Sequence, residues 1–265
     1  MTPILPWPRE LKPAVLIGRR GRFTVDALAG PGLSDPVVLH LPNSGRLATV
    51  LKPGYEALYL PANLAEQGVG GRGEAQVRVT PGSLVLVRDP RAGWVSTDAG
   101  VPARLLAAVL RATAGHSGGT EVPAAAQALA ARLGPYACVR TEPRYGSHRF
   151  DLALLDSEDR TKVLIECKSI TLVEDRTGLF PDAPTVRGAA HVRLLGQLAA
   201  SGQCRTVLVF VVGRSDAQLV RPHREMDREF GMALDEAIGH GLAVMACRVD
   251  AGLDGVDLGE EIAVR

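Results

Sequence analysis

The sequence predicts a two-part α/β protein, with a small β-barrel or sandwich in front of a domain built on a mixed β-sheet. Three observations predict this fold class. Residues 14–88 contain five or six short strand-like runs separated by Gly and Pro. From residue 102 onward, segments with helical spacing are interspersed with apolar strand-like runs. Residues 207–212 are apolar throughout, as expected of a central strand that is covered on both faces.

The first part is expected to contain short strands only. The candidates are residues 14–17, 23–25, 37–41, 57–60, 76–79 and 83–87. Many five-stranded barrels of this size bind single-stranded nucleic acid or oligosaccharide. The glycine-rich residues 68–73 look like a phosphate-binding loop, but no Lys-Ser/Thr pair follows them, and we interpret them as a turn.

The second part is expected to begin with two helices. Pro102 can occupy the first turn of one helix, and Pro123 opens an Ala-rich second helix that ends near Gly134. The order that follows is three strands and then αβαβ, which indicates a mixed sheet covered by helices. These elements are expected at 136–142, 149–155, 162–170, about 186–200, 206–213, about 224–239 and 242–249.

The charge of the chain is distributed unevenly. The net charge is only +1, which argues against a basic coat over the whole protein. Residues 1–88 carry ten Lys or Arg and six Asp or Glu, a balance of +4, and the remainder carries −3. We expect the domain boundary near residues 88–102, giving units of 1–90 and 91–265. A basic first unit beside a slightly acidic second unit is compatible with phosphate binding and a carboxylate site.

Composition restricts the class of protein. The chain has 265 residues, of which 46% are hydrophobic, and no apolar run approaches the roughly 20 residues that span a bilayer. Prolines interrupt the N-terminus where a signal peptide would be continuously apolar. We therefore expect a soluble, cytoplasmic protein that does not contact a membrane. None of the four cysteines has CxxC spacing, and all four are expected to be buried thiols.

The strongest local pattern is a hairpin that brings two carboxylates together. Residues 157–160 form a polar turn between two apolar strands. If the turn is centred between residues 158 and 159, the numbers of paired residues add to 317. Asp151 then lies opposite Glu166, and Arg149 lies opposite Lys168. Directly opposed Cβ atoms are about 4.5–5.5 Å apart.

Strand alternation assigns these side chains to faces of the sheet. Along the second strand, Glu166 and Lys168 share one face. Along the first strand, Phe150 and Leu152 are expected to point away from the face that carries Asp151.

This arrangement predicts a metal-assisted site. Two carboxylates so close repel each other unless a cation bridges them or one of them binds a proton. Mg²⁺ favours one or two carboxylates together with water and phosphate oxygens. Lys168 can neutralise charge on a phosphate or orient the attacking water. Glu-x-Lys alone is usually a solvated charge pair, but the paired Asp151 and the apolar backing of both strands favour a phosphodiester-hydrolysis site.

At this point the chain resembles the PD-(D/E)xK nuclease superfamily, and more specifically the sugar fermentation stimulation protein A family. The resemblance covers nearly the whole chain. The segments that carry it are residues 40–45, 144–146, 149–151, 165–172 and 180–188, together with His191. Cys167 stands where the family often has Val, and Ser44 stands where it often has Thr.

The resemblance implies an N-terminal OB-type barrel and a C-terminal αβββαβ nuclease-type domain. It also implies DNA binding, with Mg²⁺ or Mn²⁺ held by Asp151, Glu166 and the main-chain carbonyl of Cys167. The family has been discussed as a regulator of sugar-utilisation genes. Glu142 matches an acidic position of the family, where it is either a third acidic group near the metal or a solvated strand end.

Several basic and polar residues are candidates for DNA contacts. Arg187 and His191 are four residues apart, so they share a helix face and could both face a phosphate. Asp182 could orient them or shape the preceding loop. An arginine cluster flanks Phe23, which could stack on a base but is at least as well explained as barrel core. The candidates for DNA binding are Arg19, Arg20, Arg22, Asn43, Arg149, Arg187 and His191.

Two functions remain open from the sequence. The first is a Mg²⁺- or Mn²⁺-dependent deoxyribonuclease in which Asp151, Glu166, Lys168 and Glu142 form the catalytic set. The second is a non-catalytic DNA-binding transcriptional regulator that keeps a nuclease-like fold. The intact pair of acids with a lysine favours the first. Single- or double-stranded DNA, and a homodimer formed through an exposed sheet edge or helix face, stay open.

Overall fold

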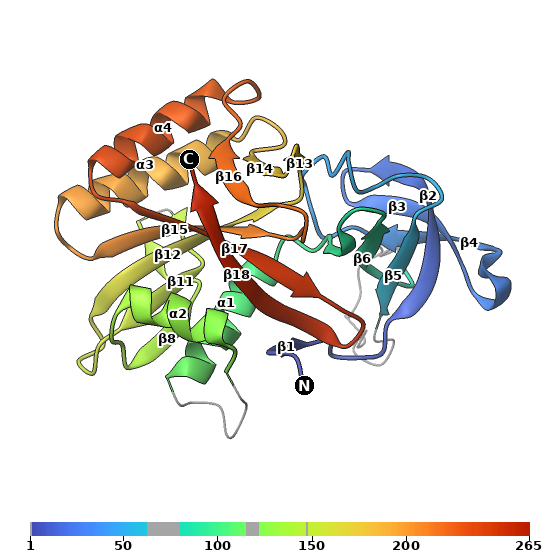
Figure 1. The fold of residues 1–265 in the computed structure, drawn as a ribbon, viewed down its shortest axis with the longest axis horizontal. Helices are drawn as coiled ribbons and strands as arrows, with labels where there is room; N and C mark the ends of the chain where they lie inside the picture. The colour runs from blue at the N-terminus through green and yellow to red at the C-terminus, as the bar shows by residue number, and fades with distance from the viewer. Residues whose placement is uncertain (1, 63–79, 115–121, 147) are drawn as a thin grey trace, which may run out of the picture.

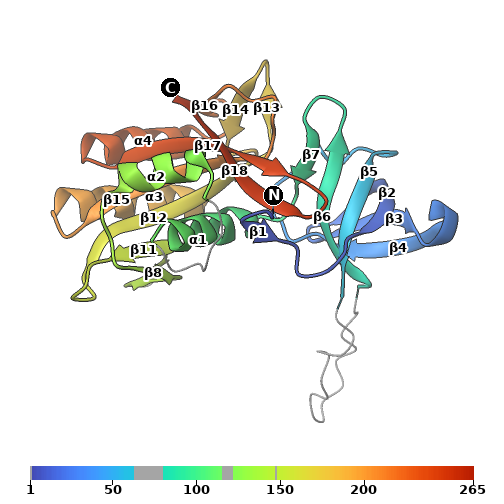
Figure 2. The same cartoon turned by 60° about the horizontal axis from the view of Figure 1, so that its bottom comes forward.

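The structure is a computed structural model that describes residues 2–62, 80–114, 122–146 and 148–265. Figure 1 and Figure 2 show two domains side by side, a β-barrel and a larger domain in which helices pack on a sheet. The predicted strand 76–79 and the glycine-rich residues 68–73 lie outside the described residues. In the described part of the chain, no helix is both long enough and apolar enough to cross a membrane.

The N-terminal domain is a five-stranded barrel. Its strands follow the order β4-β3-β2-β5-β6, and a parallel pairing of His40 with Ser83 joins β4 to β6 and closes the barrel. Buried Leu16, Val25, Leu39 and Leu84 fill its core. The strands are β2 (Lys12–Gly21), β3 (Thr24–Ala29), β4 (Asp35–His40), β5 (Glu56–Pro61) and β6 (Gly82–Asp89), with a short helix η1 (Pro31–Leu33) between β3 and β4.

The barrel sheet continues past the expected domain boundary. Strand β7 (Gly93–Ser96) pairs with β6, and Val87 lies opposite Val95. The division expected between residues 90 and 91 therefore falls in the turn between these two strands. At the other end of the chain's first segment, β1 (Leu5–Pro6) pairs with β18 of the second domain.

The second domain contains a mixed sheet of ten strands. The order is β13-β14-β16-β18-β17-β15-β12-β11-β8, with β1 on β18. Strand β15 lies between β12 and β17 and is parallel to both, as predicted for a central strand. The strands are β8 (Cys138–Thr141), β11 (Leu152–Leu155), β12 (Thr161–Ile170), β13 (Val173–Glu174), β14 (Thr177–Phe180), β15 (Arg205–Val212), β16 (Leu219–Pro222), β17 (Ala243–Ala251) and β18 (Gly255–Val264). A separate hairpin joins β9 (Arg144–Tyr145) to β10 (His148–Arg149).

Helices cover both faces of this sheet (Figure 1). Helices α1 (Val101–Thr113) and α2 (Ala124–Leu133) pack on the face that includes Val163 and Ile165 of β12. Helices α3 (Val186–Ala200) and α4 (Arg228–Gly239) pack on the opposite face, which includes Leu164. The alternation along β12 therefore places Glu166 and Lys168 on the side of α3.

Side-chain caps fix where the last two helices begin. The Thr185 hydroxyl accepts a hydrogen bond from the Gly188 N–H at 3.0 Å, and α3 begins at Val186 as predicted. The Asp227 carboxylate accepts one from the Phe230 N–H at 2.9 Å. Helix α4 therefore begins four residues later than the expected 224.

The predicted hairpin register is confirmed for three pairs, but it does not extend to Arg149, which pairs with Arg144 of β9 and not with Lys168. Leu152 pairs with Ile165, Ala153 with Leu164, and Leu154 with Val163, so the paired numbers add to 317. A bulge then shifts the register between Leu154 and Leu155.

Two expectations from the sequence were wrong in detail. Phe150 packs with the cluster beneath α3 and α4, whereas Leu152 packs with the opposite cluster, because the ladder ends before Asp151 and the alternation stops there. Cys138 is exposed and Cys204 is half-buried, so only Cys167 and Cys247 are the buried thiols expected of all four cysteines.

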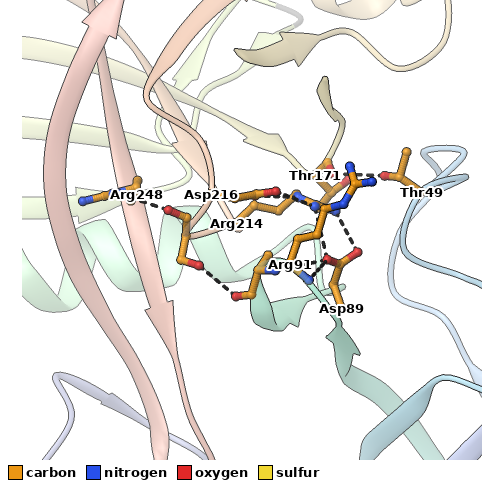
Figure 3. A network of polar contacts seen from close by, with 9 residues as sticks. Thr49, Asp89, Arg91, Thr171, Arg214, Asp216 and Arg248 are labelled. Carbon is orange, nitrogen blue, oxygen red and sulfur yellow. Dashed lines mark hydrogen bonds and ion pairs between the residues drawn. The ribbon is translucent and has the colours of Figure 1, made fainter. Parts of the chain in front are cut away.

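Polar contacts join the two domains where β6 and β7 meet the segment after β15 (Figure 3). Arg214 reaches Asp89 with nitrogen–oxygen distances of 3.1 and 3.3 Å, and both side chains are buried. The Ser215 hydroxyl donates to the Ala92 carbonyl at 2.9 Å. These contacts fix the barrel against the end of the sheet that carries the candidate site.

Candidate functional site

A cleft of about 790 Å³ opens where the barrel meets the carboxyl ends of the sheet strands. Arg22, Asn43, Ser44 and Gly45 line it from the barrel. The second domain contributes Asp151 and residues of β12 to the cleft, and residues 179–187 form another wall. The two carboxylates and the lysine predicted from the hairpin therefore lie in one cavity, which both domains enclose.

Glu166 is the most enclosed charged group of the cleft, with a relative exposure of 4%. Its Oε1 accepts a hydrogen bond from Lys168 Nζ and lies 2.8 Å from His191 Nδ1. Arg187 Nε donates to His191 Nε2 at 3.4 Å, which leaves the ring proton on Nδ1, where it points to Glu166. The other carboxylate oxygen, Oε2, is buried and has no hydrogen-bond partner among the described residues.

Asp151 lies beside Glu166, immediately before β11. Its Oδ2 accepts a hydrogen bond from the Cys167 N–H at 2.7 Å. This bond spans from one strand of the hairpin to the other, directly beyond the last pair of the ladder. The register that the sequence predicts thus continues into a contact between the Asp151 side chain and the main chain of β12.

The pKa values of the two carboxyls are shifted in opposite directions. Burial, followed by the negative charge of Glu166, raises the pKa of Asp151 from 3.8 to about 6. Burial alone would also raise the pKa of Glu166, but the hydrogen bond from His191 and the charge of Lys168 outweigh it and hold that pKa below its ordinary value. The repulsion expected between the two neighbouring acids is therefore the second contribution to the raised pKa of Asp151, after burial.

Cys167 lies between Glu166 and Lys168 but faces the other way. Its side chain is buried with Ile165 beneath α1 and α2. The residue nevertheless lines the cleft, so its main chain is the part that is turned toward the two acids.

These groups could hold a hard divalent cation. Among the residues that the structure describes, no three His, Cys, Asp or Glu side chains are grouped to bind a metal ion. Asp151 and Glu166 offer two carboxylates, and Oε2 of Glu166 is a buried anionic oxygen without a donor. A cation that takes one or two carboxylates and keeps several waters fits this donor set better than a tetrahedral zinc ion does.

Glu142 lies outside the cleft lining. Its side chain is 69% exposed and forms an ion pair of 3.1 Å with Arg149. Arg149 itself lines the cleft. The structure thus places Glu142 outside the cleft, where it is the ion-pair partner of the cleft residue Arg149.

Arg187 and His191 share a face of α3, as predicted from their spacing, but they have different environments. Arg187 is exposed and lines the cleft. His191 is only 4% exposed and is packed against Phe150, with ring centroids 5.5 Å apart. His191 therefore contacts Glu166 from the buried side of the cleft, whereas Arg187 is exposed to solvent.

The three arginines of the barrel also differ. Arg22 lines the cleft, and its guanidinium lies 5.2 Å from the centroid of the Phe23 ring. Arg20 forms an exposed ion pair with Asp26. Arg19 donates to main-chain carbonyls of Gly21, Arg22, Gly45 and Arg46. Phe23 is 45% exposed, so it does not belong to the barrel core.

Asn43 shapes the barrel loop that faces the cleft. Its side-chain amide donates to the Thr97 carbonyl at 3.0 Å and accepts from the Gly45 N–H at 2.8 Å. Asp182, from the loop before α3, accepts from the Leu47 N–H of the barrel at 3.1 Å. Asp182 thus joins the two walls of the cleft and makes no hydrogen bond or ion pair with Arg187 or His191.

Two residues near the site were missed as candidates. Arg144 and His148 line a smaller cavity that adjoins the cleft. Their signal was present in the sequence, where basic residues, Arg144 and the His148-Arg149 dipeptide, stand close together just before Asp151.

Two family models match the chain. The model described as "Sugar fermentation stimulation protein RE domain" matches residues 118–255, and the model described as "SfsA N-terminal OB domain" matches residues 17–97. The second match ends close to the last residue of β7.

Curated relatives match along nearly the whole chain. A sugar fermentation stimulation protein homolog of Geotalea uraniireducens is 32% identical over 97% of this chain and 98% of the relative. A homolog of Moorella thermoacetica is 35% identical over 92% of both chains.

A solved structure has the same fold. The structure of Pyrococcus furiosus SfsA in complex with Ca²⁺ aligns with a TM-score of 0.77 at 22% identity, over 100% of this chain and 99% of the other. The domain matches, the full-length relatives and this shared fold agree with one another, and the chain therefore belongs to the sugar fermentation stimulation protein family.

Proposed function

We propose that the protein binds DNA and hydrolyses its phosphodiester bonds at a metal-dependent site formed by Asp151, Glu166 and Lys168. The observation that carries the proposal is the environment of Glu166. One of its oxygens is held by Lys168 and His191, while the other is buried without a partner. A buried anionic oxygen without a donor is costly, and a bound cation removes that cost.

A divalent cation fits the rest of the site. Oε2 of Glu166, a carboxylate oxygen of Asp151 and the main chain of Cys167 would be its protein ligands. Bound there, Mg²⁺ or Mn²⁺ would stabilise the developing charge on a phosphate and lower the pKa of the attacking water. Pyrococcus furiosus SfsA, which has the same fold, was solved in complex with Ca²⁺, and this supports a divalent cation as the cofactor.

The chain's own residues position the reacting groups. Lys168 Nζ, held on Glu166 Oε1, can turn toward a phosphate oxygen or hold the attacking water. His191 keeps Glu166 in one orientation, because it donates to that same oxygen from the buried side. Water adds to the phosphorus, the bond to the leaving oxygen breaks, and the proton lost by the water is ultimately balanced by a proton gained by that oxygen.

The barrel supports a nucleic acid as the substrate. Arg22 brings a cation to the cleft, and it lies over the exposed aromatic ring of the neighbouring Phe23. Positive side chains that follow a phosphate backbone, with aromatic rings on which bases stack, are the usual features of single-strand binding by OB-type barrels.

A cleavage assay with matched lysine variants tests the proposal. Purified protein is incubated with single-stranded and duplex DNA, with Mg²⁺, with Mn²⁺ or with chelator. We expect metal-dependent cleavage by the wild type, and a loss of at least about a hundredfold in Asp151→Ala and Lys168→Ala, because each removes a group that acts on the transition state.

The matched control is Lys162→Ala. Lys162 is an exposed lysine on the same strand, β12, at the opposite end from the site. We expect it to cleave as the wild type does. Equal cleavage by the wild type, Asp151→Ala and Lys168→Ala would identify a contaminating nuclease and refute the catalytic assignment.

The second candidate is a non-catalytic DNA-binding regulator, which the family name connects with sugar metabolism. The observation that favours it is that, among the described residues, no three His, Cys, Asp or Glu side chains are grouped to bind a metal ion. In the same assay, a regulator of this kind would bind DNA without cleaving it under any metal condition, and Asp151→Ala would bind as tightly as the wild type.

A further inference from the structure

A second cavity of about 340 Å³ opens beside the cleft. Its lining contains three arginines and two histidines and no carboxylate: Arg144, Gly146, His148, Arg149, Arg187 and His191. Arg149, Arg187 and His191 also line the cleft, so the two cavities are adjacent. The small cavity is therefore a strongly basic extension of the candidate active site.

The β9–β10 hairpin places two of these arginines directly opposite each other. Arg144 is the cross-strand partner of Arg149. Like charges in directly opposed positions, with Cβ atoms about 4.5–5.5 Å apart, destabilise a strand pair. Glu142 pairs with Arg149, but among the ion pairs of the described residues none involves Arg144 or Arg187. The hairpin therefore holds an excess of positive charge that the described carboxylates do not balance.

A bound anion would balance that charge. Guanidinium groups present several N–H donors in a planar fork, which matches the oxygens of a phosphate. The cavity volume lies near the lower end of the ~300–1,000 Å³ range of ligand pockets, so it suits one phosphorylated group rather than a duplex.

We propose that this cavity is a subsite for a second phosphate of the substrate strand, next to the phosphate that is cleaved. The proposal rests on the proposed function, because it assumes that a nucleic-acid strand lies in the adjacent cleft. The phosphate is either a terminal monoester or an internal diester. Both offer the same oxygens to Arg144, Arg149 and Arg187.

The subsite is physically connected to the candidate metal ligand. Arg187 donates to His191 Nε2, and the opposite ring nitrogen of His191 donates to Glu166. A phosphate that fixes Arg187 therefore also fixes the chain of hydrogen bonds that orients Glu166. Occupation of the small cavity would help to align the strand with the hydrolytic groups.

A binding measurement in chelator tests the subsite without turnover. An internally labelled single-stranded oligonucleotide is displaced by unlabelled competitors that carry a 5′-phosphate, a 3′-phosphate or no terminal phosphate. We expect Arg144→Gln and Arg187→Gln each to weaken binding about tenfold, as for the loss of one charged hydrogen-bonding group. The slope of log K against log salt should fall by about 0.7 in each variant.

The matched control is Arg140→Gln. Arg140 is an exposed arginine on β8 whose carboxylate partner is Asp159, and it does not line either cavity. We expect it to bind as the wild type does. Thermal unfolding adds a second control, because Arg144→Gln relieves a like-charge pair and should not lower the Tm.

The competitors separate the two sources of the phosphate. If a phosphorylated competitor binds the wild type more tightly and loses that advantage in Arg144→Gln, the subsite holds a terminal monoester. If all competitors are equal and both variants still bind weakly, it holds an internal diester. Binding by Arg144→Gln and Arg187→Gln equal to that of Arg140→Gln would overturn the subsite, even if Asp151→Ala abolishes cleavage. Selective loss of binding with no cleavage by the wild type would refute the hydrolytic function and leave the subsite in place.

Discussion

At the scale of single residues, the two carboxylates of the cleft have different surroundings. Glu166 is held by two donors on one oxygen, and this support keeps its pKa low in spite of burial. Asp151 is buried beside a negative neighbour and has a single main-chain donor, so burial and then the charge of Glu166 raise its pKa to about 6. Metal-free protein at neutral pH must therefore keep Asp151 ionised in a position where the fold disfavours the charge.

Asp151→Asn is expected to stabilise the metal-free protein. Between an unfolded-state pKa of 3.8 and a folded-state pKa of about 6, the folded protein binds more protons than the unfolded chain. The free energy of unfolding therefore falls as pH rises through this range and stays lowered above it. Asn keeps an oxygen for the Cys167 N–H but carries no charge, so the variant should gain on the order of 3 kcal/mol above about pH 6.

Thermal unfolding in chelator from about pH 4 to about pH 8 measures this difference. It should be largest above about pH 6 and should shrink toward about pH 4, where the wild-type carboxyl is protonated. Addition of Mg²⁺ should raise the Tm of the wild type and leave the variant nearly unchanged, since ligand stabilisation requires binding to the folded state. A difference in Tm between the wild type and Asp151→Asn that does not change with pH would contradict the raised pKa of Asp151.

At the scale of elements, local patterns predicted the hairpin and the central strand. The register of Leu152 with Ile165 followed from a polar turn and from alternation, both of which operate over a few residues. Phe150 was assigned to the wrong face because the ladder ends at Leu152, and a strand period does not continue through a bend. Strand β18 was not predicted, since Gly259 and two adjacent glutamates interrupt its alternation.

Contacts between distant elements could not be predicted. His191 and Glu166 are 25 positions apart and meet only because α3 packs over β12. Arg19 looked equivalent to Arg20 and Arg22 in the sequence. Its acceptors are main-chain carbonyls, two of them 26 and 27 positions away. Every residue has such a carbonyl, so the sequence does not show which ones accept a hydrogen bond. Sequence reasoning could therefore identify a basic cluster but not the separate roles of its members.

The three arginines at the β2–β3 turn are expected to have different roles, with Arg19 stabilising the fold and Arg22 contacting a phosphate of the DNA. Arg19→Lys keeps the charge but loses the guanidinium that donates to five main-chain carbonyls, so it should lower the Tm by a few degrees and leave the salt slope of DNA binding unchanged. Arg22→Gln should leave the Tm unchanged and reduce the slope by about 0.7–0.9. Arg20→Gln serves as the control, because an exposed ion pair contributes little.

These three variants are compared by fluorescence anisotropy over a range of salt and by thermal denaturation. A reduced salt slope in Arg19→Lys, or a wild-type slope in Arg22→Gln, would contradict the prediction that Arg22 makes the phosphate contact and Arg19 does not.

At the scale of the whole molecule, the cleft exists only while the barrel keeps its position on the sheet. Its lining comes from both domains, and neither domain contains all of it. The contacts that hold this position include Thr49 with the Thr171 carbonyl at 3.4 Å and the ion pair of Arg214 with Asp89 (Figure 3). Asp89 also accepts from the Arg91 and Ala92 N–H groups, so one buried carboxylate organises the β6–β7 turn and the interface together.

Arg214→Ala should therefore uncouple the two domains. The substitution leaves Asp89 buried without its cation, and loss of one partner of a buried ion pair typically costs about 3–5 kcal/mol. Scanning calorimetry should show one transition for the wild type and two transitions, the first at a lower temperature, for the variant. DNA binding should be weaker because the cleft loses a wall.

Arg224→Ala is the matched control, since its pair with Asp235 is exposed and lies within the second domain. Arg214→Met combined with Asp89→Asn should recover part of the loss, because Asn still accepts from the turn but carries no charge. A single transition in Arg214→Ala, as high as that of Arg224→Ala, would show that the barrel is held by other contacts.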